Sequence, residues 1–155
     1  MSIIYNYNNM YGEDTSILID RLNKWKYGIL DLSNLHITSI LWFPYRLKKL
    51  NCSNTQIKSL KLPISIEWLD CSNTLISSLK IPMSLEWLNC SNTSISFLKI
   101  PNNLEFLNCS KAEITLLEVP HSFENLICDF PKLQIKVKDL YIKEDIYEDI
   151  LNIFM

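Results

Sequence analysis

Several residue types on which enzymes and metalloproteins depend are scarce in this chain of 155 residues. It contains 2 Gly and 2 His, too few for a glycine-rich phosphate loop or a histidine-centred metal site. No Cys-x-x-Cys pair occurs, and neither His36 nor His121 has an evident base or nucleophile to serve. No pair of carboxylates stands out for acid–base chemistry. We therefore expect a protein that is not an enzyme, with no cofactor and no bound metal.

Strong charge and long hydrophobic runs are also missing. The net charge is −2, and no run of five or more basic residues occurs, so nucleic acid is not an expected partner. The apolar stretches are too short to cross a bilayer, so no membrane partner is expected. The first six residues lack the basic and apolar regions of a signal peptide. These features predict an intracellular, cytoplasmic protein, or one in the virion or host cytoplasm if it is viral.

What the sequence does have is a short repeat, most visible in its cysteines. They recur at every nineteenth position, as Cys52, Cys71, Cys90, Cys109 and Cys128. Proline repeats with the same period, at Pro44, Pro63, Pro82, Pro101 and Pro120. So does a leucine, at Leu50, Leu69, Leu88, Leu107 and Leu126. Including a degenerate first copy, six strand segments extend from Leu30 to about Asp129, a pattern typical of a solenoid.

Each repeat predicts one short strand. Leu50 and Cys52 alternate with Asn51 and Ser53, which indicates a strand with one buried face. A unit this short cannot bury its own apolar side, so stacked units must share one core. The strands are then parallel, in register and about 4.8 Å apart. The cysteines lie inside, and we expect them to be buried, reduced thiols.

The repeat resembles a known family. The pattern Leu47-x-x-Leu50-x-Cys52-x-x-Thr55-x-Ile57 is similar to the leucine-rich-repeat signature, and the resemblance covers residues 27–130. The short units are similar to those of some bacterial effectors and large DNA viruses. The resemblance implies an α/β solenoid with a parallel sheet of about six strands, a short irregular convex side and helical caps at both ends. Threonine replaces the family's asparagine, and its hydroxyl can make part of the same backbone bonds. A right-handed parallel β-helix is the alternative fold.

The whole chain reads as one domain. Residues 1–12 are predicted to be flexible, and residues 13–26 to form a cap helix with Leu18, Leu22 and Trp25 on one face. Residues 27–130 hold the repeats. Within 131–155 we expect a strand over 133–137 and a helix over 143–154 that together cap the other end.

The strand register also predicts which side chains face outward. Three columns emerge across the repeats: Lys49, Trp68, Trp87, Phe106 and Asn125; Asn51, Asp70, Asn89, Asn108 and Ile127; Ser53, Ser72, Ser91, Ser110 and Asp129. Aromatic residues in the open are favoured anchors for a protein partner. The predicted partner-binding residues are therefore Trp68, Trp87, Phe106, Lys49, Asn51, Asp70, Asn89 and Asn108.

Other interpretations of the aromatic column stay open. The rings can simply stabilise strand pairing, or they can mediate self-association as a homodimer or a particle component. They can also stack on sugars. A row of glutamates next to the column, Glu67, Glu86, Glu105 and Glu124, either selects a basic partner or is only solvated charge. The identity of a protein partner is not readable from these residues.

Overall fold

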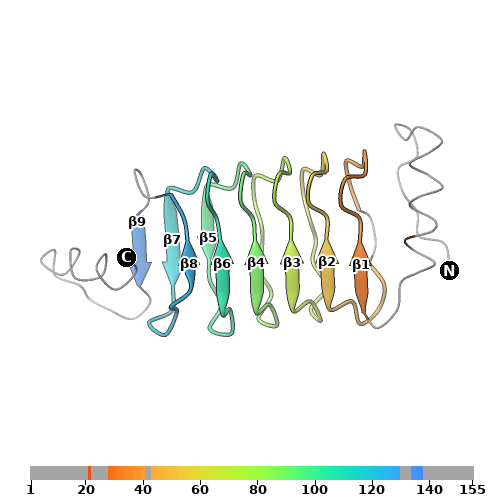
Figure 1. Cartoon of the computed structure of the whole chain (residues 1–155). Helices are drawn as coiled ribbons and strands as arrows, with labels where there is room; N and C mark the ends of the chain where they lie inside the picture. Colours follow the sequence, from red (N-terminus) through yellow and green to blue (C-terminus); the bar gives the residue numbers. More distant parts are fainter. Residues whose placement is uncertain (1–20, 22–27, 41–42, 130–133, 138–155) are drawn as a thin grey trace, which may run out of the picture.

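The chain forms a solenoid of parallel strands. The computed structural model describes residue 21 and residues 28–40, 43–129 and 134–137. Its coils stack side by side along one axis (Figure 1). The strands in these residues are β1 (Ile29–Asp31), β2 (Lys49–Asn51), β3 (Trp68–Asp70), β4 (Trp87–Asn89), β5 (Phe97–Lys99), β6 (Phe106–Asn108), β7 (Leu116–Val119), β8 (Leu126–Ile127) and β9 (Gln134–Val137).

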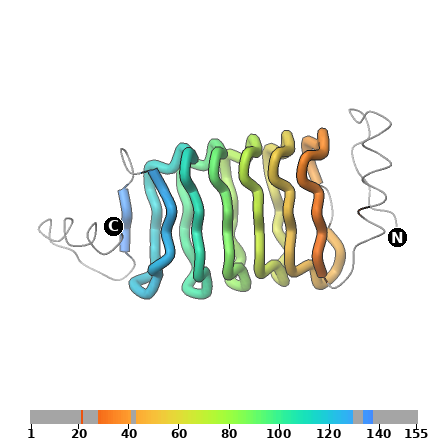
Figure 2. The backbone as a smooth tube through the Cα atoms, viewed as in Figure 1, coloured from red at the N-terminus to blue at the C-terminus, as the bar shows by residue number. Residues whose placement is uncertain are grey.

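The main sheet has six parallel strands in the order β1-β2-β3-β4-β6-β8. Its register follows the repeat, because Leu50 pairs with Leu69 and Leu69 pairs with Leu88. Equivalent residues of neighbouring coils therefore lie next to each other along the solenoid (Figure 2). The predicted parallel sheet of about six strands is confirmed.

A second parallel sheet, in the order β5-β7-β9, lies behind the main sheet (Figure 1). The prediction of a short irregular convex side is therefore wrong from Phe97 onward. Leu98 and Leu117 are fully buried between exposed or half-buried neighbours, an alternation that suits a strand. The strand predicted over 133–137 is confirmed for Gln134–Val137, and it pairs with β7. Two sheets around one core is also the arrangement expected of a β-helix.

The predicted terminal segments mostly lie outside the described residues. This applies to residues 1–12, to the helix expected over 143–154 and to all but one residue of the helix expected over 13–26. Arg21 is described and is helical. Its guanidinium donates a 2.6 Å hydrogen bond to the carbonyl of Ser33 and lies 3.6 Å from Asp31, so it contacts the first coil.

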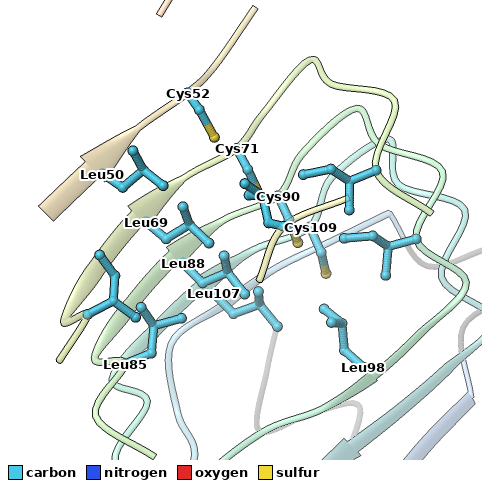
Figure 3. Packing of buried hydrophobic residues seen from close by; sticks show 14 of the residues in the cluster. Leu50, Cys52, Leu69, Cys71, Leu85, Leu88, Cys90, Leu98, Leu107 and Cys109 are labelled. Carbon is cyan, nitrogen blue, oxygen red and sulfur yellow. The ribbon is translucent and has the colours of Figure 1, made fainter. Parts of the chain in front are cut away.

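Leucine, isoleucine and cysteine side chains from every coil form one continuous core. Cys52, Cys71, Cys90 and Cys109 stack beside the strand leucines (Figure 3). All five cysteines are free. Four of them are buried as predicted, whereas Cys128 in the last coil is half-buried. Cysteine suits this column because a small apolar side chain fits between closely spaced coils.

Each coil turns at a proline corner before it enters the main sheet. The proline carbonyl accepts a hydrogen bond from the backbone N–H three residues later, as from Leu47 to Pro44 and from Ile66 to Pro63. This bond recurs at Pro82, Pro101 and Pro120. Proline removes a donor that the turn does not need and fixes the backbone for it. The result is a row of equivalent corners along one long edge of the solenoid.

The opposite edge is a row of left-handed residues that was not predicted from the sequence. Asn34, Asn54, Asn73 and Asn92 have φ between 53° and 60°. Asparagine tolerates this conformation better than other residues with a side chain. The signal was present in the sequence, because asparagine recurs at the same place in four copies. The fifth copy has Lys111 there, with φ 55°.

Replacing Lys111 with asparagine is expected to stabilise the protein by about 0.5–1 kcal/mol, because the new residue fits the left-handed backbone. Urea unfolding followed by circular dichroism measures this. Lys111→Gln is the matched control, since it also removes the charge but has no preference for positive φ. Equal stability of the two variants would attribute the effect to charge and contradict the backbone explanation.

Candidate functional site

Three aromatic rings form a stack on the open face of the main sheet. Trp68, Trp87 and Phe106 are the first residues of β3, β4 and β6, and they pair in register. The centroids of the Trp68 and Trp87 rings are 4.5 Å apart, with 10° between the planes. Those of Trp87 and Phe106 are 5.0 Å apart, with 8° between the planes. The spacing of parallel strands imposes these separations, which fall within the range of attractive aromatic contacts.

Stacking changes what this aromatic column presents to solvent. All three residues are half-buried, not open to solvent as predicted. Each ring covers a face of its neighbour, so Trp87 between the other two presents mainly its edge. A ring edge carries partial positive charge, and the carbon skeleton remains apolar. The column is therefore a narrow apolar rib on a polar sheet.

A row of Asx side chains lies beside the rings, and these side chains close turns within the fold. The Oδ1 atoms of these residues accept a hydrogen bond from the backbone N–H two residues later, at 2.9 to 3.2 Å, in Asp31, Asn51, Asp70, Asn89 and Asn108. These are Asx turns, which end each strand. The Nδ2 of Asn89 also donates to the Oδ2 of Asp70 at 3.2 Å, linking two coils.

The serine column differs from its prediction. Ser53 and Ser72 lie on the predicted side but are buried instead of open to solvent. Their hydroxyls donate to the Oδ1 of Asn51 and Asp70 at 2.8 and 2.7 Å, because a short polar side chain can bond its own turn. The sequence signal for this bond is an Asx residue followed two residues later by serine in the first five copies, and strand alternation alone does not reveal it.

A threonine ladder stabilises the same turns from inside. The hydroxyls of Thr55, Thr74 and Thr93 donate to the carbonyls of Cys52, Cys71 and Cys90 at 2.7 to 2.8 Å. This confirms the expectation that threonine bonds the turn backbone where the family signature has asparagine. Ala112 lacks the hydroxyl, and its backbone N–H reaches the Cys109 carbonyl at 3.2 Å instead.

Charged side chains border the aromatic column. Lys49, its first member, is exposed. Glu86, Glu105 and Glu124 are also exposed, while Glu67 forms an ion pair with Lys48 of the preceding coil. Within the described residues, this border is acidic along β4, β6 and β8. Glu86 and Glu105 directly precede Trp87 and Phe106 in the sequence, so one partner can contact both the carboxylates and the apolar rib.

The described ranges contain no cluster of three or more His, Cys, Asp or Glu that could hold a metal ion. They also contain no helix that is long and apolar enough to cross a membrane. No protein-family model matches the chain, and a search of curated proteins finds no match.

Proposed function

We propose that this chain is a non-catalytic leucine-rich-repeat protein, with helical caps, that binds a protein partner on the face of its main sheet. Trp68, Trp87 and Phe106 are the anchors. Lys49 and the Asx row of Asn51, Asp70, Asn89 and Asn108 border them. The observation that carries the proposal is the aromatic stack, because three adjacent rings on solvent-facing positions keep apolar surface in contact with water.

The charge beside the rings specifies the chemistry of the partner. Glu86 and Glu105 are exposed one residue before Trp87 and Phe106. A partner segment with apolar side chains and Arg or Lys can cover the ring edges and pair with these carboxylates. The Asx row contributes less than its composition suggests, because its Oδ1 atoms already accept turn hydrogen bonds.

Trp68→Ala combined with Trp87→Ala is expected to weaken capture of the partner at least tenfold, since buried aromatic anchors commonly supply about 2 kcal/mol or more of binding free energy. Wild-type and variant chains are immobilised separately, and the amounts of protein that each retains from cell extract are compared. Leu75→Ala is the control, because Leu75 is an exposed apolar residue outside the main sheet.

The same double variant tests the structural interpretation of the rings. Lost stacking costs about 0.5–1.5 kcal/mol per pair, which a folded solenoid tolerates. Circular dichroism should therefore show a folded chain. Unfolding of the double variant would mean that the stack serves stability, and unchanged capture by a folded variant would rule out the sheet face as the binding surface.

Sugar binding is disfavoured by the ring geometry. Carbohydrates pack on the faces of aromatic rings, and at separations of 4.5 and 5.0 Å the inner faces of this stack are covered. Self-assembly is the second candidate, and the observation that favours it lies on a different surface.

A further inference from the structure

An exposed apolar ridge follows the proline corners of three consecutive coils. Tyr45, Ile64 and Met83 each come directly after the corner proline, and these residues are 79%, 90% and 62% exposed. Together they form the corner ridge. The coils that carry them are stacked next to each other (Figure 2). The register of the main sheet aligns equivalent positions of these coils, so the three residues lie in a row.

The fold does not require apolar side chains at this place. The fourth and fifth corners have Asn102 and His121 in the same position and make the same turn, closed by the hydrogen bonds to Pro101 and Pro120. Turn tips are commonly polar, and single exposed apolar residues need no explanation. Three in a row on adjacent coils are a continuous apolar surface, which favours contact with another molecule.

Two rows of opposite charge flank the corner ridge. Lysines lie three residues before the tip, on the side of the second sheet: Lys61, Lys80 and Lys99. Glutamates lie three residues after the tip, at the start of the main sheet: Glu67, Glu86 and Glu105. Around Ile64 and Met83 the surface is thus basic on one side, apolar in the middle and acidic on the other side, whereas beside Tyr45 the position of the glutamate is held by Lys48.

This arrangement is complementary to itself under one symmetry. If a second copy is related to the first by a two-fold axis parallel to the ridge, the two ridges face each other and run in the same direction. The rotation places the lysine side of one copy opposite the glutamate side of the other. Each lysine row therefore faces the other copy's glutamate row, coil by coil. A two-fold axis across the ridge would instead place like charges together. An isologous dimer needs such a self-complementary patch.

We propose that the corner ridge is a self-association surface and that its occupant is a second copy of this chain in the parallel arrangement. Ile64 and Met83 pack against their counterparts. Lys80 of one copy pairs with Glu86 of the other, and Lys61 approaches Glu67, whose carboxylate also pairs with Lys48 of its own chain. An anionic lipid surface fits less well, because the glutamate row would be repelled by it.

The size of the ridge indicates a weak dimer. Three coils at about 4.8 Å give a length of about 14 Å, and a strip of this length and about 15–20 Å width buries roughly 400–600 Å² over both copies. This lies well below the range of stable complexes, so we expect a dissociation constant on the order of 100 micromolar. Because its ion pairs are solvent-exposed, raising the salt concentration should weaken the dimer several-fold.

Sedimentation equilibrium of the full chain over a dilution series tests the proposal. Wild type should change from dimer to monomer across micromolar concentrations. Ile64→Ser with Met83→Ser should be monomeric and folded. Trp68→Ala with Trp87→Ala should still dimerise, since those rings lie on the sheet face. A wild-type chain that stays monomeric at several hundred micromolar overturns the proposal. So does the opposite pattern in the variants, in which Trp68→Ala/Trp87→Ala is monomeric and Ile64→Ser/Met83→Ser still dimerises.

Charge exchange tests the symmetry. The acidic variant Lys61→Glu/Lys80→Glu and the basic variant Glu67→Lys/Glu86→Lys should each be monomeric, because like charges face each other in their homodimers. Mixed in equal amounts, they should form a heterodimer. Lys111→Glu/Lys136→Glu is the matched control. It has the same net charge as the acidic variant, but its substitutions lie away from the ridge, so it should not pair with the basic variant. Failure of the mixture to associate, or equal association of the control, contradicts the arrangement.

Discussion

Raising the pH from 9 to 12 is expected to unfold this protein, because thiols that stay protonated in the folded core ionise in the unfolded chain. Burial raises the pKa of Cys52 and Cys71 well above the ordinary 9.0 and raises the pKa of Cys90 to about 12. A hydrogen bond with Cys128, together with burial, raises the pKa of Cys109. Desolvation disfavours the thiolate, which has no compensating cation in this column.

The direction of the effect follows from proton binding. Below pH 9 both states hold the thiol protons, so the contribution of these groups is constant. Above pH 9 the unfolded chain releases them, while the folded chain keeps them until the pH passes the raised pKa. The free energy of unfolding then falls by about 1.4 kcal/mol per pH unit for each thiol, or at most about 5–6 kcal/mol per unit for four. A typical stability of about 5–15 kcal/mol is lost within one to three units.

Guanidinium unfolding at pH 7, 9, 10 and 11 measures this slope. Cys71→Ala combined with Cys90→Ala removes two of the four thiols and should roughly halve the slope, even though the cavities lower stability at every pH. Ile57→Val combined with Ile76→Val is the control, because both side chains are fully buried and carry no thiol, so this variant should lose stability without a change in slope. Equal slopes for wild type and the double variant would mean that other groups cause the alkaline loss.

The repeat period was sufficient to predict the main sheet. The constant spacing between the cysteines places Leu50, Leu69 and Leu88 in one register, and the period also fixes which residue precedes each leucine on the outer face. The second sheet was not predictable in this way. In the coils before β5, residues 59–61 and 78–80 hold the same positions of the repeat as β5 but form no strand.

The candidate site was predictable in position but not in geometry. Alternation placed Trp68, Trp87 and Phe106 on one face, whereas the near-parallel stacking that half-buries them depends on side-chain rotamers. Alternation also placed Ser53 on the open face and could not show that its hydroxyl turns back to Asn51. Local hydrogen bonds of short polar side chains compete with the orientation that a strand imposes.

The central coil is expected to be the most sensitive to loss of core volume, and Leu88→Ala should lower the free energy of unfolding by about 3–5 kcal/mol. Leu88 is fully buried in β4, with Leu69 of β3 and Leu107 of β6 beside it in register. Coils on both sides therefore lose packing, and the stacked neighbours hold the cavity open. Leu126→Ala in β8 should cost only about 1–2 kcal/mol, because Leu126 is half-buried and can relax.

The two substitutions should also differ in cooperativity. Each coil contacts mainly its neighbours, so the coupling between the two ends of the solenoid passes through β4. Leu88→Ala is expected to lower the denaturant m-value as well as the midpoint, since the weakened centre lets the two halves unfold separately. Leu126→Ala should shift the midpoint alone. Guanidinium titrations followed by circular dichroism and tryptophan fluorescence test this in a Trp25→Phe/Trp42→Phe background, where Trp68 and Trp87 alone report on the centre. Coincident transitions with an unchanged m-value for Leu88→Ala would show that the array unfolds as a single unit.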